Sequence, residues 1–138
     1  WQGRVPWEEV RGAYSTHDVF IFCTLRDSSA AQFLEAMAFG LPVITLNLHG
    51  ARSLIPKNAG IKVAVTTPER TTDQLAEAVE YLAANPHIRA RLGVNGYEFA
   101  KTQTWTRKTE IVRNLYSQIA TESVCSSQWL HCSEWMPG

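Results

Sequence analysis

Apolar residues in this chain form short continuous runs, which are separated by stretches with helical spacing. The runs DVFIFCTL at 18–25, PVITL at 42–46 and IKVAV at 61–65 are rich in β-branched and aromatic residues. Continuous apolar runs of this length predict strands that are buried on both faces, as in a parallel sheet. Strands that alternate with helices predict an α/β fold with a Rossmann-like, doubly wound parallel sheet, whose ligands bind at the carboxyl ends of the strands.

The stretches between and after these runs favour helices. AQFLEAMAF follows two serines that can cap a helix and precedes Gly40 and Pro42, so it predicts a helix over about 30–39. The pattern predicts a short helix that begins near Pro6, and longer helices over about 72–84, 86–101 and 105–120. Residues 47–60 hold several turn residues and are predicted to form a loop.

The elements predict one domain over residues 1–120. Residues 121–138 have no periodicity and are predicted to form a loose tail. The chain opens without Met, and we interpret it as a fragment, an excised domain or a processed chain.

Composition narrows the range of partners. The 13 basic and 13 acidic residues cancel, so the chain has no electrostatic footprint for nucleic acid or an anionic membrane. No apolar run approaches the roughly 18–20 residues that span a bilayer, and the opening residues lack a signal-peptide pattern. Cys23, Cys125 and Cys132 do not suggest a disulfide framework, and with His131 they do not match the spacing of a zinc site. We therefore expect a cytoplasmic protein with no bound metal ion.

One carboxylate stands out in the stretch LRDSSAAQFLEAMAFGLPVI at 25–44. Between Ser28 and Ala51 the only formally charged side chain is Glu35, which lies among Ala, Phe, Leu and Met residues. A charged group in apolar surroundings needs a partner. A ligand is one candidate partner for Glu35, and a surface Lys or Arg is the alternative.

The start of the predicted central helix suits an anion. Its first N–H groups are unpaired and directly follow a buried strand, and the small residues Ser28, Ser29, Ala30 and Ala31 let a phosphate or diphosphate approach the backbone. The alternative is that the serines only cap the helix and the alanines only fill its interior.

A second carboxylate precedes this helix. At 1.5 Å per residue, Asp27 and Glu35 are about 12 Å apart along the element, too far to share a proton. They could instead hold the two ends of a long ligand, with a diphosphate between them, because carboxylates accept hydrogen bonds from vicinal hydroxyls. A nucleotide sugar has this form. The alternative for Asp27 is a further helix cap.

At this point the sequence resembles a known family. A carboxylate, seven residues, then a Glu followed by AMAFGLPVI resembles the donor-binding motif of the retaining glycosyltransferases of family four, which have the two-domain GT-B fold. The segments GRVPWEEV, HDVFIFCTLRDS, LHG, GIKV and TWTRK…LY also resemble the C-terminal domain of that family, in the same order. The resemblance covers about residues 1–118 and implies that the chain is part of that C-terminal half.

The resemblance implies roles for individual residues. Glu35 would bind the ribose hydroxyls of the donor nucleotide, and Asp27 would lie beside the transferred sugar as a catalytic residue. Backbone N–H groups around Ser29, Ala30 and Ala31 would hold the distal phosphate. No metal ion or other cofactor is implied, because the helix dipole and cationic side chains would stabilise the leaving diphosphate.

Four residues depart from the family pattern. The first acid is usually Glu, whereas here it is Asp27. A glycine pair commonly follows it, whereas here Ala30 and Ala31 stand in its place. The loop that often reads Gly-Gly is His49–Gly50, and His49 is a further candidate for contact with the donor.

The resemblance also implies missing parts. Family members have an N-terminal domain that binds the acceptor, and their C-terminal domain begins earlier, with a strand and helix that carry a basic pair. We expect the sheet to be incomplete on its N-terminal side, the isolated chain to be inactive, and any peripheral membrane contact to occur through the missing half. A non-catalytic module that binds a nucleotide or a partner, and a fragment of a nucleotide-sugar epimerase of the same architecture, are the alternatives.

Overall fold

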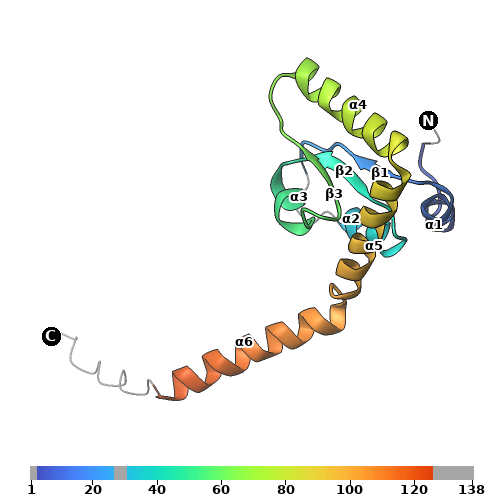
Figure 1. Cartoon of the computed structure of the whole chain (residues 1–138). Helices are drawn as coiled ribbons and strands as arrows, with labels where there is room; N and C mark the ends of the chain where they lie inside the picture. Colours follow the sequence, from blue (N-terminus) through green and yellow to red (C-terminus); the bar gives the residue numbers. More distant parts are fainter. Residues whose placement is uncertain (1–2, 27–30, 126–138) are drawn as a thin grey trace. The chain divides into compact units, whose positions relative to one another are not determined.

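The computed structural model describes residues 3–26 and 31–125, and it divides into two compact units, Trp1–Thr102 and Gln103–Gly138. The elements are shown in Figure 1 and run in the order α1 (Trp7–Thr16), β1 (Phe20–Phe22), α2 (Ala31–Ala38), β2 (Val43–Leu46), α3 (His49–Leu54), β3 (Gly60–Val63), α4 (Pro68–Ala84), α5 (Pro86–Lys101) and α6 (Trp105–Cys125).

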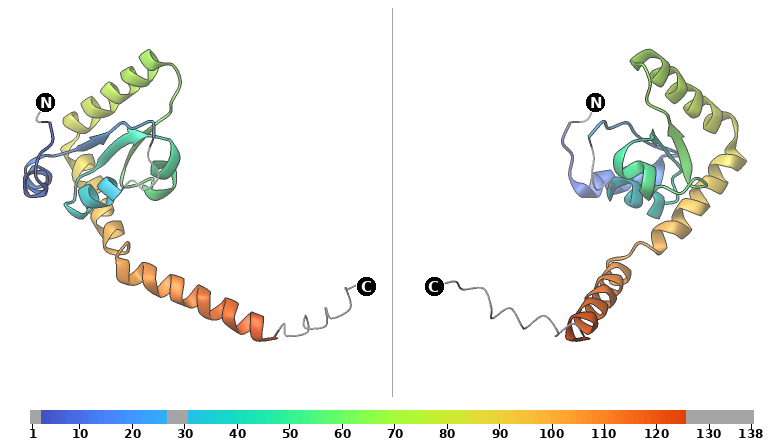
Figure 2. Two further views of the ribbon diagram at one scale, coloured as in Figure 1. Left: turned by 180° about the vertical axis from the view of Figure 1, so that it is seen from behind. Right: turned by 90° about the vertical axis from the view of Figure 1, so that its left-hand side faces the viewer.

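The sheet is parallel, as the continuous apolar runs predicted. Its three described strands stand in the order β1-β2-β3, with Ile44 in register with Ile21 on one side and Ile61 on the other. All four residues of β2 are buried, so the prediction of a strand covered on both faces is confirmed there. Helices lie on both faces of the sheet (Figure 2), and the prediction of an α/β fold with a Rossmann-like half is confirmed.

Strand β1 differs from the prediction. It spans three residues rather than eight, and Ile21 is 46% exposed. Its neighbours Phe20 and Phe22 point to the opposite face and pack edge-on against Phe33 of α2. Within the described sheet β1 is an edge strand, and Phe20 and Phe22 are only partly buried. An apolar run by itself does not distinguish an edge strand from a central one.

Two hydrophobic clusters hold the sheet between its helices. Neighbouring residues of β2 serve different clusters, because successive side chains of a strand point to opposite faces. The cluster on the side of α2 and α3 contains Phe33, Met37, Val43, Ala51, Ile55 and Ala59. The cluster on the side of α4 and α5 contains Ile44, Val63, Ala78, Leu82 and Leu92.

The end of α2 has the geometry that Gly40 and Pro42 predicted. Gly40 has φ +74°, a left-handed value that favours glycine. Its N–H donates to the carbonyl of Met37 at 2.9 Å, and the N–H of Leu41 donates to the carbonyl of Ala36 at 3.1 Å. These two bonds form a Schellman motif, which satisfies carbonyls at the end of the helix.

Helix α5 packs closely against α2 through two glycines. A Cβ at Gly93 would lie 2.1 Å from the carbonyl oxygen of Gly40, and one at Gly96 would lie 3.0 Å from Met37 Cγ. By intrinsic propensity these glycines only weaken the helix. The structure shows that they allow two backbones to approach each other.

Three bounds differ from the sequence predictions. The predicted loop at 47–60 contains the short helix α3. Helix α4 begins at Pro68, four residues before the predicted 72, because Thr67 caps it by accepting a hydrogen bond from the N–H of Arg70 at 3.3 Å. Helix α6 continues to Cys125, past the predicted end at 120.

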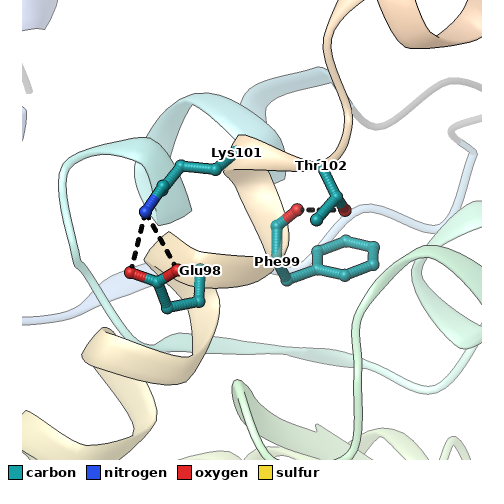
Figure 3. A network of polar contacts seen from close by, with 4 residues as sticks. All are labelled: Glu98, Phe99, Lys101 and Thr102. Carbon is teal, nitrogen blue, oxygen red and sulfur yellow. Dashed lines mark hydrogen bonds and ion pairs between the residues drawn. The ribbon is translucent and has the colours of Figure 1, made fainter.

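Local polar contacts close the end of α5 (Figure 3). Lys101 donates to both carboxylate oxygens of Glu98, at 3.0 and 3.1 Å, and the hydroxyl of Thr102 donates to the carbonyl of Phe99 at 2.7 Å. These contacts mark the last turn of the helix. Because the groups are exposed, they contribute little to the free energy of unfolding.

The second unit contains α6. Thr104 caps this helix, since its Oγ1 accepts a hydrogen bond from the N–H of Arg107 at 3.3 Å. The predicted tail at 121–138 therefore begins inside α6, and the part of it beyond residue 125 lies outside the described residues.

Candidate functional site

The carboxyl ends of β1 and β2 meet at one edge of the sheet. The hydroxyl of Thr45, the third residue of β2, donates to the carbonyl of Phe22, the last residue of β1, at 2.8 Å. Beyond this bond is a cavity of about 10 Å³, room for one water molecule. Thr24, Thr45 and His49 contribute its polar lining, and Phe33 contributes part of the apolar lining.

Most of the predicted phosphate site lies outside the described residues. Asp27, Ser28, Ser29 and Ala30 lie outside the described residues, and α2 is described from Ala31 onward. Because α2 follows the carboxyl end of β1, its first turn stands at the sheet edge that the sequence predicted for a ligand. The roles of these four residues stay predictions.

His49 and Gly50 open helix α3 directly after β2. His49 is exposed and has φ 42°, the single non-glycine residue with positive φ within residues 3–26 and 31–125. A left-handed non-glycine residue stores backbone strain. Its place on the cavity brings His49 to the same edge as the start of α2, and its contact with a donor stays a prediction.

Glu35 has a partner that the sequence reasoning missed. Its Oε2 accepts a hydrogen bond from the hydroxyl of Tyr14 at 3.2 Å, and the side chain is half-buried. No Lys or Arg in the described part of the chain forms an ion pair with it. Successive helix residues are about 100° apart, so Phe33 faces the cavity while Glu35 faces α1.

Tyr14 is held by aromatic rings. It is 7% exposed, and its ring centroid lies 6.4 Å from that of Trp7, 5.7 Å from Phe20 and 5.5 Å from Phe39. A buried tyrosine hydroxyl needs an acceptor, and this was the signal that could have pointed to Glu35.

Burial and the neighbouring carboxylate change the acidity of Tyr14. Loss of solvent, the negative charge of Glu35 and the hydrogen bond to it together raise the pKa of Tyr14 from 10.0 to about 12. All three causes favour the neutral phenol in the folded chain.

The raised pKa predicts a loss of stability at alkaline pH. The folded pKa exceeds the unfolded one, so the contribution of Tyr14 is complete below pH 10.0 and disappears as the pH rises toward about 12. Tyr14→Phe should lack this loss. Urea unfolding of both proteins between pH 8 and pH 11 measures it, and parallel pH dependence in the two would contradict the prediction.

A second hollow lies at the opposite end of the strands. It has a volume of about 310 Å³ and is lined by residues that precede β1 and β2 and by the start of α5. Arg89 there donates to the carbonyl of Leu82 at 2.8 Å and lies 3.8 Å from Asp18, so its guanidinium has protein partners. His17 is exposed at this hollow.

The sequence also matches a known family. The family model of glycosyl transferases group 1 matches residues 1–99. The chain belongs to this family. Its resemblance to glycosyltransferases, noted from the motif around Glu35, is thereby confirmed at the level of the family.

Similar curated proteins are also glycosyltransferases. The chain is 24% identical over 111 residues to D-inositol 3-phosphate glycosyltransferase of Saccharomonospora viridis, which covers 80% of the chain and 25% of that protein. It is 24% identical over 112 residues to the sulfoquinovosyl transferase SQD2 of Arabidopsis thaliana, covering 81% of the chain and 22% of that protein. The chain thus spans about a quarter of the length of the curated relatives it matches.

Two solved structures share the fold. Sucrose-phosphate synthase of Thermosynechococcus elongatus has a TM-score of 0.72 and 25% identity over 87% of this chain and 30% of its own. The C-terminal domain of a glycosyl transferase group 1 family protein (LpcC) of Francisella tularensis has a TM-score of 0.63 and 19% identity, over 75% of this chain and 51% of that domain.

None of the helices in the described part of the chain is both long and apolar enough to cross a bilayer. The cytoplasmic location stays a prediction.

Proposed function

We propose that this chain is the donor-binding part of a retaining glycosyltransferase, which transfers a sugar from a nucleoside diphosphate sugar to an acceptor. Membership of the glycosyl transferases group 1 family supports the reaction class. The observation that carries the proposal is the partly buried carboxylate of Glu35, on a helix that follows the carboxyl end of β1.

In this proposal, Glu35 accepts hydrogen bonds from the ribose hydroxyls of the donor, because an ionised carboxylate offers about four acceptor sites and Tyr14 occupies one. The N–H groups at the start of α2, around Ser29, Ala30 and Ala31, hold the distal phosphate. Asp27 lies beside the transferred sugar.

The loop after β2 completes the proposed site. His49 and Gly50 stand at the same edge of the sheet, where His49 borders the cavity. The leaving diphosphate is stabilised by the helix dipole and by cationic side chains, without a metal ion. Donor affinity should therefore be the same with and without a chelator.

The acceptor site lies in a part of the protein that this chain does not include. Support comes from the curated relatives, since the chain covers only 25% and 22% of the two described above. We propose that the remainder supplies the acceptor-binding domain and that this chain alone binds a donor without turnover.

Calorimetry with UDP, GDP and ADP tests the proposal. One of the three should bind, and Glu35→Ala should weaken it about 10-fold to 100-fold, the loss expected when hydrogen bonds to a charged group are removed. Glu80→Ala, an exposed carboxylate on α4, is the matched control and should leave the affinity unchanged.

Two outcomes would contradict the proposal. Unchanged affinity in Glu35→Ala would remove the assigned role of Glu35. No heat with any of the three nucleotides, in a sample that circular dichroism shows to be folded, would favour a non-catalytic interaction module. An epimerase would differ from both, because the complete protein would release a free sugar isomer without an acceptor.

A further inference from the structure

The carboxylate of Glu35, proposed above to bind the donor, is linked to a second helix by one hydrogen bond. Tyr14 of α1 and Glu35 of α2 are 21 positions apart in the sequence, and the tyrosine hydroxyl donates to Oε2 at 3.2 Å. Within the described residues, this is the one hydrogen bond to the Glu35 side chain that the structure shows.

The two partners differ in rigidity. Tyr14 is fixed by three aromatic neighbours, and its backbone belongs to a continuous helix. A glutamate side chain has several rotatable bonds and loses rotamer freedom when it is held in one place. The rigid Tyr14 therefore fixes the position of the flexible Glu35 carboxylate.

We infer that Tyr14 is a positioning residue for the donor site, whose hydroxyl holds Glu35 so that Oε1 stays free to accept from the ribose. This inference rests on the proposed role of Glu35. A phenol has one donor hydrogen, so it can engage only one carboxylate oxygen and leaves the other for a ligand. Tyr14 itself does not contact the donor.

A purely structural role for Tyr14 would have a different consequence. The aromatic packing around its ring would remain in Tyr14→Phe, and only the hydroxyl would be lost. A structural defect would weaken the binding of every nucleotide alike, whereas a misplaced Glu35 would affect only nucleotides that have ribose hydroxyls.

The experiment compares two forms of one nucleotide. The tightest binder among UDP, GDP and ADP is titrated by calorimetry, together with its 2′,3′-dideoxy counterpart, into the wild type and into Tyr14→Phe. Tyr14→Phe should weaken the ribonucleotide about fivefold, on the scale of one hydrogen bond of about 1 kcal/mol, and leave the dideoxy form unchanged. Tyr81→Phe, with a tyrosine that is 49% exposed on α4, is the matched control and should change neither affinity.

A double variant tests whether Tyr14 acts through Glu35. In a Glu35→Gln background, which keeps an acceptor for the tyrosine hydroxyl, adding Tyr14→Phe should cause no further loss of ribonucleotide affinity. Additive losses in the double variant would overturn the inference. So would equal weakening of both nucleotide forms in Tyr14→Phe, or a ribonucleotide affinity equal to or tighter than that of the wild type.

The same titrations distinguish a failure of the inference about Tyr14 from a failure of the proposed role of Glu35. If Glu35→Gln and the wild type prefer the ribonucleotide equally, or if no nucleotide binds, the proposed role of Glu35 fails and the inference with it. If the preference depends on Glu35 but not on the Tyr14 hydroxyl, only the inference fails.

Discussion

Gly93→Ala is expected to lower the free energy of unfolding by about 3 kcal/mol, the upper end of the usual cost of overpacking. The added Cβ would lie 2.1 Å from the carbonyl oxygen of Gly40 and 3.2 Å from its carbonyl carbon. Both atoms belong to the backbone, and Gly40 is held by the Schellman motif at the end of α2. The two helices must therefore separate.

Helix propensity acts in the opposite direction. Replacing glycine by alanine within a helix gains about 1 kcal/mol, so the clash must exceed this gain before any loss is observed. Gly12→Ala in α1 is the matched control, because its Cβ would meet nothing within 4 Å. It should raise stability by about 0.5–1 kcal/mol. Urea unfolding followed by circular dichroism measures both, and a Gly93→Ala protein as stable as Gly12→Ala would contradict the close packing of α5 on α2.

Phe33→Ala is expected to lower the free energy of unfolding by about 3–5 kcal/mol, the range for a phenylalanine truncated in a core. The side chain is 1% exposed, and its ring meets Phe20 and Phe22 edge-on, at centroid distances of 6.1 and 5.5 Å. Its loss would leave a cavity under the first turns of α2, between the helix and β1.

Phe39→Ala provides the comparison for Phe33→Ala. Phe39 ends the same segment and is 38% exposed, so the same atoms are removed from a position that water already reaches. Its cost should stay near the centre of point-mutant effects, about 1 kcal/mol. Equal losses in the two variants, measured by urea unfolding, would show that Phe33 does not carry the packing of α2 on the sheet.

Much of the backbone could be predicted from local pattern. The pattern of apolar residues predicted the bounds of β2, α2 and α5 to within about two residues. It could do so because an element that is buried on one or both faces has apolar residues at a characteristic spacing. Gly40 ended its helix as predicted, since a left-handed C′ position favours glycine over other residues. The motif around Glu35 indicated the family, and the family model confirmed it.

The candidate site was predicted less completely. The sequence singled out Glu35 as a carboxylate that needs a partner, and it offered a ligand or a basic side chain. The partner in the structure is Tyr14, which the sequence did not single out. His49 was placed in a loop, whereas it begins a short helix at positive φ.

The sequence alone determined where β2, α2 and α5 lie, and that one carboxylate lies in apolar surroundings. Only the tertiary structure decided that β1 is an edge strand in the described sheet, that Gly93 faces the backbone of Gly40, and that Tyr14 holds Glu35. The physical reason is distance along the chain. Periodicity along the chain reports only the surroundings of residues that are close in sequence. The order of the strands and the contacts of Gly93 and Tyr14 involve segments that are far apart in sequence, so no repeat records them.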